Sequence, residues 1–103
     1  MTQFRKAPAR FFDGAPAIVK AQVLDLIKIT PAAPLDFDVI LRPEPEAEEV
    51  TGLDFDRHGA QGCHFFLKPW EARAYRQRNA RKRVSWSELP AATQARIVAY
   101  LES

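Results

Sequence analysis

Residues 35–42 read LDFDVILR, and the pattern of this stretch decides the fold class. Leu35, Phe37 and Val39 alternate with two aspartates and Ile40, so these three apolar side chains gather on one side of an extended chain. Successive side chains of a β-strand point to opposite faces of its sheet. The alternation therefore predicts a strand over these residues, and it is the clearest strand in the chain.

Two later segments also predict strands. They are residues 50–57 and residues 63–67, and a turn at residues 59–62, GAQG, separates them. Residues 43–49, PEPEAEE, form an acidic loop with two prolines before the second strand. Connections this short join antiparallel neighbours, so we expect a three-stranded antiparallel meander.

The segment before the first strand fits two patterns. Its apolar residues fall on one face of a helix over residues 17–29, with Asp13 as a candidate N-cap. The same residues alternate over 23–30 and so also fit a strand. We favour the helix, which Pro31 and Pro34 would end. The residues on its apolar face are Ile18, Val19, Val23, Leu26 and Ile27.

Two helices are predicted after the sheet. Pro69 suits the first turn of a helix over residues 69–83, because the backbone N–H that proline lacks has no partner there. The last helix opens over residues 87–90 and ends near Leu101. Its apolar stripe should pack on the sheet or on the first helix. The stripe consists of Leu89, Ile97, Tyr100 and Leu101.

The expected fold is α+β, with an N-terminal helix, a small three-stranded antiparallel sheet and two C-terminal helices. A chain of 103 residues, 47% of them hydrophobic, can bury one modest core. We expect a basic and aromatic arm over residues 1–12 and a single domain over residues 13–103. Cys63, the single cysteine, excludes an intramolecular disulfide and fits a reducing compartment. No apolar run suits a membrane span or a signal-peptide core, so a cytoplasmic location is expected.

Charge is segregated along the chain. Eight carboxylates and one arginine give residues 36–56 a net charge of −7. Seven cations and one glutamate give residues 68–83 a net charge of +6. The formal net charge of the whole chain is only +2, so the molecule is strongly dipolar. Such asymmetry bears on association and not on fold.

The basic run at residues 73–83, RAYRQRNARKR, is the local feature that points to a partner. Its apolar edge is too narrow for a core helix, which predicts a surface helix with most of its arginines free. Arginine binds phosphate bidentately and stacks on bases, and Trp70 and Trp86 could add stacking surfaces. We therefore predict a small regulator that contacts DNA or RNA, although a solvated helix would carry the same pattern. The predicted contact residues are Arg73, Arg76, Arg78, Arg81, Lys82, Arg83 and Tyr75.

The acidic loop supports an alternative hypothesis. Its carboxylates resemble the charge array of a nucleic acid, so the protein could be an inhibitor of phage type that blocks a nucleic-acid-binding partner. It could equally be an adaptor that uses this loop or an exposed aromatic patch to bind a basic protein surface. A loop that only keeps the chain soluble is the plainer interpretation. The carboxylates concerned are Glu44, Glu46, Glu48 and Glu49.

A catalytic or metal site is not expected. Cys63 and His64 are neighbours on one predicted strand, so their side chains would point to opposite faces and could not share one ion. The chain has no second cysteine, no paired histidines at helical spacing and no phosphate-binding glycine loop. A magnesium-dependent hydrolase built on Asp54, Asp56 and His58 is a remote third hypothesis. We expect no enzyme and no cofactor, and the sequence leaves the oligomeric state open.

Overall fold

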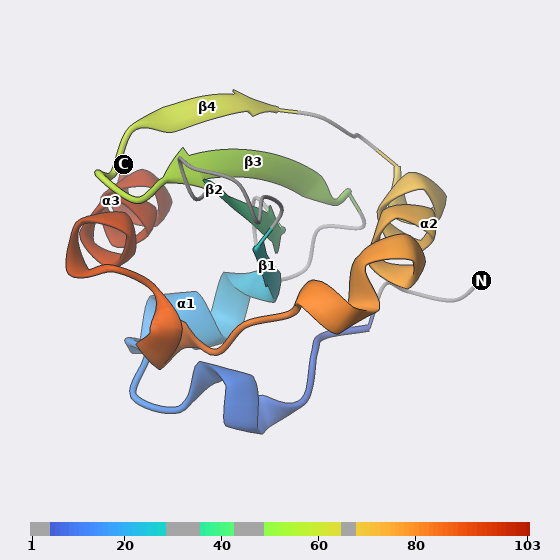
Figure 1. Cartoon of the computed structure of the whole chain (residues 1–103), viewed down its shortest axis with the longest axis horizontal. Coiled ribbons are helices and arrows are strands. Elements are labelled where there is room, and N and C mark those ends of the chain that lie inside the picture. The colour runs from blue at the N-terminus through green and yellow to red at the C-terminus, as the bar shows by residue number, and fades with distance from the viewer. Residues whose placement is uncertain (1–4, 29–35, 43–48, 65–67) are drawn as a thin grey trace.

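The computed structural model describes residues 5–28, 36–42, 49–64 and 68–103. Four strands form one antiparallel sheet in the order β1-β2-β3-β4 (Figure 1). Their bounds are β1 Val23–Lys28, β2 Asp36–Leu41, β3 Thr51–Asp56 and β4 Gln61–His64. The α+β class and the antiparallel sheet are confirmed, but the prediction of three strands is wrong.

The additional strand is β1, which we had assigned to the N-terminal helix. The helix α1, Ala17–Gln22, ends where β1 begins, and Pro16 rather than Asp13 lies at its N-cap position. Short apolar runs fit both periods, and pairing decides between them. β1 pairs with β2 over its length, and Val23 to Ile27 are all buried because both faces of the strand are covered.

The C-terminal half contains two α-helices and two short 3₁₀ turns. α2, Pro69–Asn79, continues into η2, Ala80–Lys82, and α3 spans Ala91–Glu102. The residues predicted to begin the last helix form the separate turn η3, Trp86–Glu88. A capping box between Ser85 and Glu88 caps the N-terminus of this turn. Pro90 then takes the N-cap position of α3, and its carbonyl accepts the first helical hydrogen bond from Gln94.

The two faces of the sheet carry different cores. The register pairs Phe37 with Phe55 and Val39 with Leu53, and these side chains belong to the larger core cluster. That cluster also holds buried residues of α1, α3 and the 3₁₀ turns η1 (Ala9–Phe12) and η3. The opposite face carries a smaller cluster, in which Ile40 packs with Ala72 of α2. The helix α2, which carries much of the basic run, therefore covers the face of the sheet opposite to the larger core cluster.

The outer edge of β1 is covered by two distant parts of the chain. The backbone N–H of Ala7 donates to the carbonyl of Leu24 at 2.8 Å, and the N–H of Val84 donates to the carbonyl of Leu26 at 2.9 Å. An uncovered strand edge invites pairing with another chain. Residues 5–12 and residues 83–84 thus lie beside the same strand, which sets the geometry of the site described next.

Candidate nucleic-acid interface

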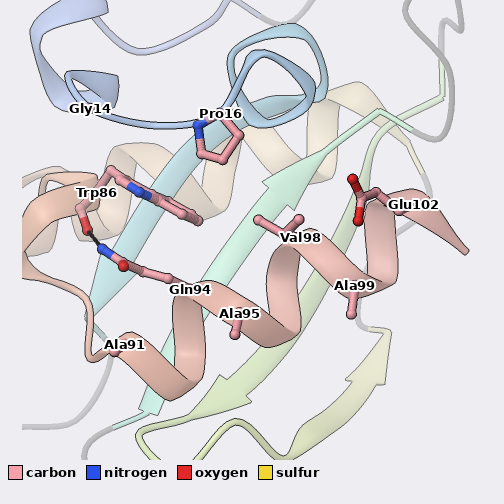
Figure 2. Close-up of a pocket in the computed structure, with 9 residues that line it drawn as sticks. All are labelled: Gly14, Pro16, Trp86, Ala91, Gln94, Ala95, Val98, Ala99 and Glu102. Atoms are coloured by element: carbon pink, nitrogen blue, oxygen red, sulfur yellow. Dashed lines mark hydrogen bonds between the residues drawn. The ribbon is translucent and has the colours of Figure 1, made fainter.

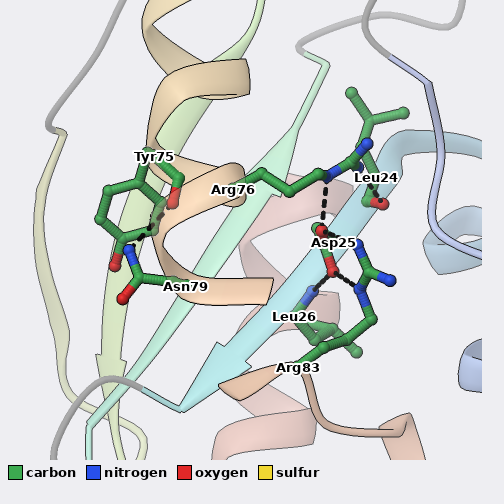
Figure 3. Close-up of polar contacts among 7 residues, drawn as sticks. All are labelled: Leu24, Asp25, Leu26, Tyr75, Arg76, Asn79 and Arg83. Carbon is green, nitrogen blue, oxygen red and sulfur yellow. Dashed lines mark hydrogen bonds and ion pairs between the residues drawn. The ribbon is translucent and has the colours of Figure 1, made fainter. Parts of the chain in front are cut away.

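Asp25 of β1 is a buried carboxylate that forms ion pairs with two arginines of the basic run. Its side chain is 0% exposed and accepts two ion pairs, from Arg76 Nε at 2.6 Å and from Arg83 Nε at 2.8 Å (Figure 3). A second Arg83 nitrogen donates to Asp25 Oδ2 at 2.9 Å, and the backbone N–H of Leu26 donates to Oδ1 at 2.9 Å. A buried carboxylate is tolerated only with such full satisfaction.

Arg76 and Arg83 are therefore structural cations. Their side chains are 17% and 20% exposed. The Arg76 side chain also donates to the carbonyl of Leu24 at 3.2 Å. The backbone of Arg83 forms an isolated antiparallel β-bridge with Ile27. Burial lowers the pKa of Arg76, while the charge of Asp25 and its hydrogen bond oppose that shift. The expectation that most of the arginines are free fails for these two, because a buried aspartate holds both.

Tyr75 also faces inward. Its hydroxyl donates to Oδ2 of Asp38, a residue that is 3% exposed on β2. Tyr75 packs against the smaller core cluster, and the Arg78 guanidinium lies 5.9 Å from the centre of its ring. Tyr75 therefore joins α2 to the sheet. Its ring packs against the protein and is not held out in solvent, where a base could stack on it.

The remaining predicted cations lie on the surface. Arg73, Arg78, Arg81 and Lys82 are all exposed, and Arg73 has a further contact within the chain. Arg78, Arg81 and Lys82 form no ion pair with any residue in the described ranges. The charges of Arg78, Arg81 and Lys82 are therefore not neutralised by ion pairs within those ranges.

The N-terminal segment adds cations that the sequence analysis did not assign to the site. The guanidinium of Arg10 lies 4.8 Å from the centre of the Phe11 ring, and that of Arg83 lies 5.4 Å from it. The Leu24 carbonyl that accepts from Arg76 also accepts from the backbone of Ala7. Ala7 therefore lies near the C-terminal half of α2, and Arg10 and Phe11 lie near Arg83, which follows η2; Figure 1 shows the start of this segment passing below α2.

These cations lie on two segments that are far apart in sequence and meet at the edge of β1, and we refer to their exposed side chains together as the basic surface. Burial lowers the pKa of Lys6, and the charge of Lys20 on α1, outside these two segments, lowers it further. Asp25 contributes a single negative charge against two guanidiniums, so the buried cluster also remains positive. The exposed cations of the basic surface are Arg5, Lys6, Arg10, Arg73, Arg78, Arg81 and Lys82.

Of the two tryptophans proposed for stacking, one is buried and the other is exposed. Trp86 is 5% exposed and belongs to the larger core cluster, so the prediction that it adds a stacking surface is wrong. It lies in η3, which packs beside η1 against that cluster. Trp70, in the first turn of α2, is 61% exposed.

The other predicted site residues belong to the acidic loop and to β3 with the turn that follows it. Within the acidic loop, Glu49 is described and exposed, while Glu44, Glu46 and Glu48 lie outside the described residues. Asp56 accepts hydrogen bonds from the backbone N–H groups of Ala60 and His58, both at 2.8 Å, and so shapes the β3–β4 turn.

The remote metal hypothesis receives no support from the geometry. The described residues contain no group of three or more histidine, cysteine, aspartate or glutamate side chains placed to hold a metal ion. The side chains of Cys63 and His64 lie outside the described part of the chain.

A separate hollow of about 520 Å³ lies along α3 (Figure 2). Gly14, Pro16 and Trp86 form one side of it, and Ala95 and Val98 line the helix side. Sites for small molecules usually combine an apolar pocket with several convergent polar groups. Here the polar side chains are Gln94, which donates to the carbonyl of Trp86 at 2.8 Å, and Glu102.

Comparison of the chain with models of protein families, with curated proteins and with solved structures finds no match. None of the helices in the described ranges is long and apolar enough to cross a membrane.

Proposed function

We propose that the protein binds the phosphate backbone of nucleic acid through the basic surface. One observation carries this proposal: residues 5–10 and the α2–η2 segment converge at β1, with Arg10 and Arg83 beside the same Phe11 ring. Two basic segments that meet in space make a broader cationic patch than either makes alone. Within α2 and η2, Glu71 is the single acidic residue.

Electrostatic attraction to phosphate accounts for this arrangement. A cation that neutralises a phosphate releases a condensed counterion, so the affinity falls steeply as salt rises. The buried Asp25 cluster fixes the backbone of the α2–η2 segment without consuming its exposed charges. On this account Arg76, Arg83 and Tyr75 hold the surface in place, and the exposed cations contact the phosphates.

The test is a charge reversal with a matched control. The variant Arg81→Glu/Lys82→Glu alters two exposed residues of η2. The control Arg57→Glu/Arg96→Glu alters two exposed residues beside the β3–β4 turn, where the Arg96 side chain lies near Gly59. Both variants change the formal net charge from +2 to −2. Arg57 and Arg96 donate hydrogen bonds to His58 and Gln61, so thermal unfolding first checks that both variants are folded. A difference in binding between the folded variants then reports the position of the charge and not its amount.

Binding is measured with labelled single- and double-stranded DNA and RNA across a salt series. We expect the wild type and the control to bind at low salt, and the η2 variant to lose at least about tenfold in affinity, or about 1.4 kcal/mol. Absence of binding at low salt would refute the proposal. So would an equal loss in both variants, because the effect would then follow net charge alone.

The inhibitor or adaptor hypothesis stays a prediction. Its carboxylates lie mainly at residues 43–48, outside the described part of the chain, and Glu49 is exposed. If no nucleic acid binds, a search for a basic protein partner of this loop is the next experiment.

A further inference from the structure

The helix α2 has two chemically distinct faces. Ala72, Tyr75 and Arg76 point toward the sheet and make the buried and polar contacts described above. Trp70 and Gln77 are exposed on the opposite side, at the spacing that places residues on one helical face. The outer face therefore combines an indole ring with polar and cationic neighbours. Its exposed members are Trp70, Arg73, Gln77, Arg78 and, in the following turn, Arg81.

Trp70 is the feature of this face that the fold does not explain. Among the described residues it is the exposed large hydrophobic side chain, at 61%. The smaller core cluster takes Ala72 from α2 and does not include Trp70. The indole ring therefore does not contribute to that core. An indole ring left in water costs free energy that binding can recover by covering it.

The surrounding charge identifies the kind of partner that would cover the ring. Cations flank Trp70 along α2 and continue into η2, so the partner is an anion that also presents flat apolar surfaces. A strand of nucleic acid with unpaired bases has both features, and base stacking on aromatic rings contributes about 1–3 kcal/mol per base. In a duplex the base faces are stacked on one another and unavailable to a side chain.

We propose that the outer face of α2 binds single-stranded nucleic acid, with one unpaired base stacked on Trp70. The inference rests on the proposed function and narrows its ligand to single-stranded DNA or RNA. An α-helix rises 1.5 Å per residue, so Arg78 lies about 12 Å from Trp70 along the axis of α2. A strand with a base on Trp70 reaches the cations of α2 with its neighbouring phosphates.

The experiment compares three proteins on two ligands. Wild type, Trp70→Ala and Trp70→Phe are titrated against a short labelled single strand and against the duplex of the same sequence, at several salt concentrations. Trp70 is exposed, so thermal unfolding of the variants should match that of the wild type. This check separates a binding effect from misfolding.

We expect the wild type to prefer the single strand. Trp70→Ala should weaken single-strand binding by about tenfold and leave duplex binding unchanged, while Trp70→Phe should retain most of the affinity. The salt dependence should be the same in all three proteins, because stacking releases no counterion. The wild-type tryptophan emission should also change on single-strand binding, and Trp70→Phe should lack that change.

The possible failures are distinguishable. If no nucleic acid binds, the proposed function and this inference both fail. If single strand and duplex bind equally, or Trp70→Ala weakens both equally, the stacking inference fails while backbone binding stands. A third arm uses vesicles with anionic headgroups. Vesicle binding that depends on Trp70, without any preference for single strands, would overturn the inference in favour of a lipid surface.

Discussion

Arg76 and Arg81 belong to the same basic run, yet their surroundings differ sharply. Arg76 is 17% exposed and paired with a buried aspartate, whereas Arg81 is exposed and forms no ion pair within the described ranges. The comparison teaches that a run of like charges can combine two roles. The inward cations fix the position of the helix, and we propose that the outward cations contact a partner.

The largest expected effect is on the inward side. Asp25→Ala would leave two largely buried guanidiniums without their counter-charge, which costs about 3–5 kcal/mol when a buried pair is broken. We expect the free energy of unfolding, measured with denaturant, to fall by that amount. The control Asp13→Ala removes an exposed carboxylate and should change it by less than about 0.5 kcal/mol. An equal, small effect in both variants would contradict the structural role of Asp25.

The comparison between the two arginines can be tested directly. Arg76→Gln removes a charge-assisted hydrogen bond to Asp25, which still keeps Arg83, so a loss of about 1–3 kcal/mol in unfolding free energy is expected. Arg81→Gln should leave that free energy unchanged within about 0.5 kcal/mol. If Arg81→Gln destabilises the protein as much as Arg76→Gln, the division into inward and outward cations is wrong.

The sequence predicts this fold in part, and the reasons differ by segment. β2 was predictable because its alternation matches a sheet with different cores on its two faces. α2 was predictable because Pro69 marks its first turn. β1 was missed because its short apolar run fits a helix as well as a strand, and the pairing with β2 that decides between them is a tertiary contact.

The sequence predicted which segment carries the candidate site, but it did not predict which side chains of that segment face the sheet and which face solvent. The density of arginine pointed to the α2–η2 segment, but charge alone does not tell which side chains face the sheet. The one available signal was Asp25, a lone acid within the apolar run Val23 to Ile27. A buried charge requires partners, and only tertiary structure brings residues 76 and 83 to it. The contribution of residues 5–10 likewise depends on pairing with the β1 edge.

A smaller effect concerns Asp56, a partly exposed carboxylate that contrasts with the buried Asp25. Hydrogen bonds from the backbone N–H of Ala60 and then of His58 lower the pKa of Asp56, although slight burial opposes them. A depressed pKa in the folded state stabilises the fold above the ordinary aspartate pKa of 3.8, and this stabilisation is lost as pH falls through the lowered value.

We therefore expect Asp56→Asn to unfold at a lower temperature than the wild type at neutral pH. The difference should shrink as pH falls below 3.8, because the wild-type carboxylate then becomes protonated and loses its charge. Thermal unfolding of both proteins over about pH 7 to pH 2 measures this. A difference that stays constant over that range would show that the charge of Asp56 is not responsible.

The most direct test of the central claim is the salt dependence of nucleic-acid affinity after neutralising two outward cations. For a single strand, each phosphate contact contributes about 0.7 to the slope of log affinity against log salt. Arg81→Gln/Lys82→Gln should therefore reduce the slope by up to about 1.4, and Arg57→Gln/Arg96→Gln should leave it unchanged. An unchanged slope in the η2 variant, or the same reduction in the control, would contradict the assignment of the outward cations to the interface.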